Sequence, residues 1–191
     1  LIPTKPNLEF ESALWEAGIS LIGGIDEAGR GCLAGPVCAA VVILTPEKNT
    51  LRLFSGVRDS KDMTEAQRNL QKTLIEKNSL DWGVGFASNL EIDRLGILPA
   101  TRLAISRAID QLHQKPEHLL VDYLVLPEIP VSQTRLVKGD ARSLTIAAAS
   151  ILAKTYRDDF MKSILNDPPP SFEECERAPW PGLEAVLLKA L

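Results

Sequence analysis

The sequence predicts a protein of the α/β class, built on a mixed β-sheet that is flanked by helices. Short apolar stretches rich in β-branched residues alternate along the chain with segments of helical periodicity. Two of the apolar stretches, at 19–26 and 36–44, follow each other closely, whereas helical segments precede the later stretches at 81–88 and near Asp122. Of the 191 residues, 45% are hydrophobic. A chain of this length and composition can bury one substantial core.

The first half of the chain contains three predicted strands and a helix. The link between 19–26 and 36–44 is short and glycine-rich, so we expect these strands to be antiparallel neighbours. A helix is expected to begin at Thr64, because Gln67 completes a capping-box pattern three residues later. A third strand is expected at 81–88, and Ser88 with Glu91 repeats the capping-box pattern at its end.

The second half predicts a helix, two strands and a long helix. Apolar positions within 98–112 have helical spacing, and "HLLVDYLVL" contains a buried strand that ends near Asp122. After a proline-containing loop, "TRLVK" is a short strand. The longest helix is expected over "ARSLTIAAASILAKTYRDDFMKSIL", whose small "AAAS" centre permits close packing on a sheet. Residues 182–190 could form a last short helix.

Charge and cysteine content limit the function classes. The formal net charge of −4 argues against a nucleic-acid-binding protein, unless divalent cations offset clustered acids. Cys32, Cys38 and Cys175 make neither a disulfide framework nor a zinc site, so we expect a reducing, cytoplasmic location. His113 and His118 are expected in surface loops. No apolar run approaches a membrane span, and the N-terminus lacks the pattern of a signal peptide.

Acidic residues follow several of the predicted strands. Asp26 and Asp122 each end an apolar strand, and Asp140 follows "LVKG". If the strands are neighbours, these side chains emerge at one end of the sheet, and Glu27 can join them if "AGRG" turns the chain there. Four gathered carboxylates would repel one another unless cations lay between them, and ligands that are all oxygen indicate Mg²⁺ or Mn²⁺. The alternative is that each aspartate merely starts a turn.

The segment "AGRGCLAG" joins the first two predicted strands. Gly29 and Gly31 flank Arg30, so the backbone could approach a ligand closely and grip a sugar hydroxyl. The alternative is a tight hairpin without a ligand. The glycine spacing is one residue off the dinucleotide fingerprint and the segment leads into a strand, which counts against a Rossmann-type nucleotide binder.

Six basic residues near these motifs could contact phosphates. They are Arg58, Lys61, Lys138, Arg142, Lys154 and Arg157. Lys138 is the strongest candidate because it lies two residues before Asp140, and Lys61 in "DSKD" is the second. The alternative for each is a solvated surface position. Asp158 and Asp159 could join the acidic cluster or form an exposed helix face.

Five segments together resemble bacterial ribonuclease HII. They are "GIDEAGRGCLAGPVCAAVVIL", "DSKDMTEAQR", "GFASNLEIDRLGILPATRLAISRAI", "LLVD" and "LVKGDARSLTIAAASILAKTYRD". The resemblance implies a single ribonuclease H-like domain over 1–191 with a catalytic core at about 19–165. Residues 166–191 form the C-terminal tail, where a small helical segment is expected from the sequence alone. The resemblance also implies cleavage of the RNA strand of RNA–DNA hybrids, and cleavage 5′ of ribonucleotides embedded in duplex DNA.

The resemblance implies a role for each matching position. The catalytic and metal-binding residues would be Asp26, Glu27, Asp122 and Asp140. The substrate-binding residues would be Gly29, Arg30, Gly31, Lys61 and Lys138. The glycine-arginine loop would sense the ribose 2′-hydroxyl. Hydrolysis with two Mg²⁺ or Mn²⁺ ions would leave 5′-phosphate and 3′-hydroxyl ends, and a monomer is expected.

The sequence departs from the family after its longest helix. Family members carry there a segment rich in Tyr, Gly, His and Lys, with a tyrosine that packs on the substrate sugar. In this chain Leu165 is followed by "NDPPPSFEEC", and Tyr123 and Tyr156 do not match that position. The departure motivates an alternative function, a catalytically impaired nucleic-acid-binding module that lacks this tyrosine segment.

Overall fold

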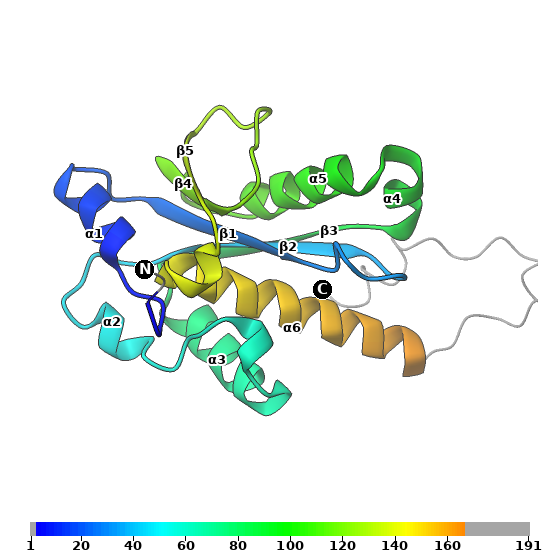
Figure 1. The fold of residues 1–191 in the computed structure, drawn as a ribbon, viewed down its shortest axis with the longest axis horizontal. Coiled ribbons are helices and arrows are strands. Elements are labelled where there is room, and N and C mark those ends of the chain that lie inside the picture. Colours follow the sequence, from blue (N-terminus) through cyan, green and yellow to red (C-terminus); the bar gives the residue numbers. More distant parts are fainter. Residues whose placement is uncertain (1–2, 167–191) are drawn as a thin grey trace, which may run out of the picture. The chain divides into compact units, whose positions relative to one another are not determined.

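The computed structural model describes residues 3–166 and contains the predicted mixed sheet (Figure 1). Its five strands lie in the order β3-β2-β1-β4-β5. They are β1 (Ile22–Ala28), β2 (Val37–Ile43), β3 (Asp81–Ala87), β4 (His118–Asp122) and β5 (Ser132–Leu136). The central strand β1 is antiparallel to β2, as predicted, and parallel to β4. Because β4 and β5 are also parallel, three neighbouring strands end at the same edge.

Six α-helices and two short 3₁₀ turns accompany these strands within residues 3–166. The helices are α1 (Glu9–Glu16), α2 (Thr50–Leu53), α3 (Glu65–Asn78), α4 (Asn89–Leu95), α5 (Ile97–Asp110) and α6 (Leu144–Asn166). The 3₁₀ turns are η1 (Ser60–Asp62) and η2 (Gly139–Ala141). Both predicted capping boxes are present, at Thr64 and Ser88. Every helix within residues 3–166 is too short or too polar to span a lipid bilayer.

The two faces of the sheet are covered by different helices (Figure 1). On one face, side chains of β1 and β4 such as Ile25 and Val121 pack with α5 residues such as Ile105. On the other face, the small residues 147–149 of α6 are fully buried against β2, together with Ile75 of α3. The predicted close packing of the "AAAS" centre is confirmed. Leu1–Arg157 form one compact unit, and the chain from Asp158 onward belongs to a second.

Several boundaries differ from the predictions. The strand expected to end at Asp26 continues to Ala28, because β2 pairs with it that far. The long helix begins at Leu144, since the 3₁₀ turn η2 occupies its expected start. The short helices α1 and α2 were not predicted. The helix expected at 182–190 lies outside the described residues, and the single domain over 1–191 stays a prediction.

The expectation that both histidines occupy surface loops is wrong for one of them. The side chain of His113 is 92% exposed. His118 is buried because it is the first residue of β4, and its Nε2 lies 2.8 Å from Thr134 Oγ1 on the neighbouring strand β5.

Candidate active site

Asp26 and Asp122 lie side by side at one end of the two central parallel strands. The residues before them, Ile25 and Val121, are paired in the sheet register. Alternate residues of a strand share a face, so Asp26 lies on the face of Gly24, against α6. Asp122 likewise shares the face of Leu120, which packs with α6. Both carboxylates therefore stand on the α6 side of the sheet, as the prediction of a shared end requires.

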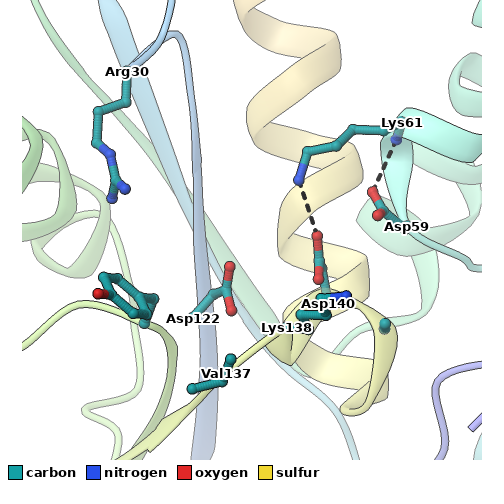
Figure 2. Close-up of a pocket in the computed structure, with 9 residues that line it drawn as sticks. Arg30, Asp59, Lys61, Asp122, Val137, Lys138 and Asp140 are labelled. Carbon is teal, nitrogen blue, oxygen red and sulfur yellow. Dashed lines mark hydrogen bonds and ion pairs between the residues drawn. The ribbon is translucent and has the colours of Figure 1, made fainter. Parts of the chain in front are cut away.

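Asp140 reaches the same place from the turn η2, beyond the end of β5. The chain leaves β5 through Lys138, whose φ of 56° is left-handed, and the Gly139 N–H then donates to Asp122 Oδ1 at 2.7 Å. This hydrogen bond ties the turn to the end of β4. Asp140 is only 5% exposed. Figure 2 shows Asp122 and Asp140 beside one another, with Lys61 reaching Asp140 and Arg30 reaching toward the same hollow.

Glu27 is placed differently from its prediction. The chain does not turn at Glu27, which pairs with Ala39 of β2 and so stands on the α5 face, opposite to Asp26. The turn begins two residues later at Gly29, whose φ is 105°. Glu27 nevertheless belongs to the same electrostatic cluster, and its Oε1 accepts a hydrogen bond from Arg30 Nη1 at 2.9 Å.

The glycine-arginine loop is held from behind by Arg157, which is therefore neither the possible phosphate contact nor the solvated surface residue that was its alternative. Arg157 is buried, and its Nε and Nη2 donate to the carbonyls of Pro36 and Ala34 at 2.9 and 2.8 Å. Its side chain passes so close to Gly29 that a Cβ there would lie 2.3 Å from Nε. Only glycine tolerates both this contact and the positive φ of this position.

A polar hollow of about 480 Å³ joins the acids to several of the predicted basic residues. Its lining residues are Arg30, Asp59, Lys61, Asp122, Tyr123, Val137, Lys138, Asp140 and Ala141. Lys61 Nζ lies 3.2 Å from Asp140 Oδ2 although the side chain is 76% exposed. Arg142 instead stacks on the Phe10 ring, 4.9 Å from its centre. Asp59 and Tyr123 were not predicted here, although each adjoins a predicted position.

A buried glutamate that sequence reasoning missed fixes the start of α6. Glu11 of α1 is fully buried, and its Oε1 accepts hydrogen bonds from the Ser143 hydroxyl at 2.6 Å and the Thr145 N–H at 3.0 Å. A carboxylate from a distant segment therefore caps the N-terminus of α6. The cap lies directly after η2, so α1 helps to position Asp140. A single glutamate in an amphipathic segment gives no signal of this role.

Burial and mutual repulsion make this a site that favours cations. Burial raises the pKa of Asp26 well above its ordinary value, and repulsion from Glu27 and then Asp122 adds to the effect. Burial also raises the pKa of Glu27 to about 7, although Arg30 opposes it, and raises the pKa of Asp122. These carboxyls are therefore costly to ionise unless positive charge is brought near them.

This cost predicts that the metal-free protein loses stability as pH rises. The folded-state pKa of Glu27 is about 7 and its ordinary value is 4.5, so the folded protein binds more protons across this window. The stability that the protonated Glu27 side chain contributes to the folded protein is complete below pH 4.5 and is lost as the pH rises through about 7. We expect Glu27 to lower the free energy of unfolding by up to about 3 kcal/mol between pH 4.5 and 8.

Urea unfolding of the metal-free protein across this pH range measures the effect. Glu27→Gln should have a flatter profile than the wild type, because it cannot ionise. Equal slopes for the two proteins would contradict the expectation.

The donor set fits Mg²⁺ or Mn²⁺, which prefer carboxylate oxygen. As the side chains stand in residues 3–166, no three acidic, histidine or cysteine groups are close enough together to hold one ion. Two ion pairs explain part of the separation between the acidic groups, since Arg30 pairs with Glu27 and Lys61 pairs with Asp140. Ion binding would require Lys61, whose side chain is exposed, to release Asp140.

Comparison with known proteins shows which protein family has a sequence similar to this chain. The family model of Ribonuclease HII matches residues 23–172. Ribonuclease HII of Dehalococcoides mccartyi is 48% identical over 156 residues, which cover 82% of this chain and 74% of that protein. The enzyme of Bacteroides thetaiotaomicron is 51% identical over 150 residues, covering 76% and 72% of the two chains. For that of Clostridioides difficile the identity is 49%, and the chain spans 58% of its length.

Solved structures agree in fold. The ribonuclease H2 of Pyrococcus horikoshii matches with a TM-score of 0.64 and 30% identity, covering 76% of this chain and 75% of that one. The ribonuclease HII of Archaeoglobus fulgidus, solved in complex with PCNA, matches with a TM-score of 0.65 and 28% identity, covering 77% and 76%. A ribonuclease HIII solved with Mn²⁺ has a TM-score of 0.64 at 20% identity, which supports the fold alone.

The mixed sheet with acids at the ends of its central strands thus defines a nuclease of the ribonuclease H class. Within that class, the chain belongs to the ribonuclease HII family. It is an endonuclease that hydrolyses the RNA strand of its substrate.

Proposed function

We propose that this protein cuts the RNA strand of RNA–DNA hybrids, and cuts duplex DNA on the 5′ side of an embedded ribonucleotide. The observation that carries the proposal is the meeting of Asp26, Asp122 and Asp140 from three elements beside the loop that holds Arg30. The family membership and the all-oxygen donor set support it. The acids would hold two Mg²⁺ or Mn²⁺ ions, with Glu27 as the fourth ligand.

The acids, the lysines and the glycine loop around the hollow would have different roles in this reaction. When bound, the two ions would lower the pKa of a coordinated water and offset the charge on the scissile phosphate. Lys138 and Lys61 line the same hollow and would contact substrate phosphates, with Lys61 exchanging Asp140 for a phosphate oxygen. The backbone at Gly29 and Gly31 would meet the ribose. The products would carry 5′-phosphate and 3′-hydroxyl ends.

A cleavage assay with three matched duplexes tests the proposal. One duplex carries a single ribonucleotide, one is an RNA–DNA hybrid and one is all DNA, each with Mg²⁺, Mn²⁺ or EDTA. We expect cleavage of the first two with either ion only, and products that DNA ligase can reseal. Binding of the ribonucleotide duplex without cleavage would instead favour an impaired nucleic-acid-binding module.

Arg30→Ala is expected to reduce discrimination between ribose and deoxyribose. Arg30 pairs with Glu27 and lines the hollow. Its removal would break this ion pair, so the loop would no longer be held in position beside the sugar. Loss of about one good hydrogen bond to the sugar would lower the rate ratio between the ribonucleotide and all-DNA duplexes about tenfold. The exposed Arg52 of α2 provides a control as Arg52→Ala, which should keep the wild-type ratio. An unchanged ratio in Arg30→Ala would remove the loop from sugar recognition.

A further inference from the structure

The residue directly after Asp122 has an unusual conformation. Tyr123 has a φ of 58°, a left-handed value that a bulky side chain rarely adopts. The Leu124 N–H donates to the Asp122 carbonyl at 2.6 Å, which closes a three-residue turn around Tyr123. The Tyr123 N–H donates to the Leu136 carbonyl of β5 at 2.9 Å. The backbone is therefore fixed on both sides of a position where glycine would be less strained.

No contact within the described residues explains why this position carries a tyrosine. The side chain is 61% exposed, and within residues 3–166 it has no hydrogen bond, ion pair or ring contact. It contributes to none of the three hydrophobic clusters that the described part of the chain forms. A strained residue that persists without packing is more often found at a functional site than elsewhere.

Tyr123 does line the hollow that holds the catalytic acids. Its neighbours there include Asp122, Lys138 and, from the opposite loop, Arg30. A ring in this hollow lies where a duplex must come if its cleaved strand is to reach Asp122 and Asp140. The 2′-hydroxyl faces the minor groove, where sugar faces and base edges are open to an aromatic side chain.

We propose that Tyr123 is a substrate-contacting residue, whose ring packs against the sugar and base edge of the nucleic-acid duplex beside the cleaved bond. The inference rests on the proposed function and adds a contact to it. The charged residues of the hollow bind the phosphates, whereas the Tyr123 ring supplies apolar contact area that is insensitive to salt.

The matched pair Tyr123→Phe and Tyr123→Gly separates contact from structure. Phenylalanine keeps the ring, and glycine removes it while adopting the positive φ without strain. In an Asp26→Asn background, binding of a fluorescent duplex with one ribonucleotide is measured by anisotropy in Mg²⁺. We expect Tyr123→Gly to bind about 5- to 150-fold more weakly, the range for loss of an aromatic contact to a nucleotide. Tyr123→Phe should bind like the parent, and Tyr123→Gly should melt no lower than it.

Two further readouts are specific to a ring contact. With native Asp26, Tyr123→Gly should raise KM more than it lowers kcat, whereas misplacement of Asp122 would lower kcat. The loss of affinity should be equal at 50 and 200 mM salt, whereas Lys138→Ala should make binding less salt-dependent. Val125→Ala changes an exposed residue of the same segment that does not line the hollow, and should bind normally.

Each outcome decides the inference. Parent-like affinity of Tyr123→Gly overturns it and leaves the proposed function intact. A fall in both melting temperature and kcat, shared by Tyr123→Phe, overturns it in favour of a purely structural turn. If the parent itself neither binds nor cuts the ribonucleotide duplex, the proposed function fails, and the inference fails with it.

Discussion

Asp26→Asn is expected to abolish cleavage while leaving the protein folded. Asp26 is 7% exposed at the end of the central strand, and its charge interacts with Glu27, Asp122 and Asp140. Asparagine keeps the shape and the acceptor for the Glu27 N–H, which donates to Asp26 Oδ1 at 2.8 Å. It removes one of the negative charges that would hold the ions. The loss should exceed about 100-fold, the upper range for removal of an outer-shell partner of a metal.

Thermal unfolding makes this prediction independent of the assay. The metal-free variant should be at least as stable as the wild type, because it no longer contains a carboxyl whose ionisation is opposed first by burial and then by repulsion from Glu27 and Asp122. Added Mg²⁺ or Mn²⁺ should raise the melting temperature of the wild type more than that of the variant.

Asp59→Asn is the matched control for Asp26→Asn. Asp59 lines the same hollow, and asparagine can still accept the Lys61 N–H bond that Asp59 makes at 2.9 Å. The cleavage rate of Asp59→Asn should fall less than tenfold, since this variant keeps the carboxylate of Asp26 on the central strand. Wild-type cleavage by Asp26→Asn, or its unfolding, would contradict the prediction.

Much of the fold could be predicted because its signals are local. Capping boxes at Thr64 and Ser88 depend on residues three apart, and the apolar runs of β1, β2 and β4 show burial directly. The end of β1 was misplaced because Glu27 is polar, while its backbone still pairs with β2. The start of α6 was predicted three residues too early, at Ala141, because that residue favours a helix but lies in the 3₁₀ turn η2.

The site was predictable in its residues and less so in its geometry. Asp26 and Asp122 could be predicted to lie at a common edge of the sheet, because each follows an apolar strand and the inference needs only that the two strands are neighbours. The roles of Arg157, Glu11 and Tyr123 depend on contacts between distant segments or on a single backbone angle. No pattern along the chain distinguishes a buried arginine that holds a loop from a surface arginine that meets phosphate.

Gly24→Ala is expected to disrupt the packing that brings the acids together. An added Cβ at Gly24 would lie 2.4 Å from the Thr145 carbonyl carbon and 2.6 Å from the Ile146 nitrogen, so it would meet the backbone of α6. Backbone cannot rotate away as a side chain can, and α6 must therefore move off β1. We expect the free energy of unfolding to fall by about 3 kcal/mol, the upper end of typical overpacking costs.

The same shift would separate Asp140 from Asp26, because η2 leads directly into the first turn of α6. A displacement of about 1 Å at a reacting centre can cost about 100-fold in rate. We therefore expect Gly24→Ala to lose cleavage even at temperatures at which it remains folded. Gly31→Ala is the control for stability, because no atom of residues 3–166 lies within 4 Å of its added Cβ, and its urea unfolding should match the wild type. If Gly24→Ala unfolds and cleaves like the wild type, close contact between α6 and the central strand is not what holds the acids in place.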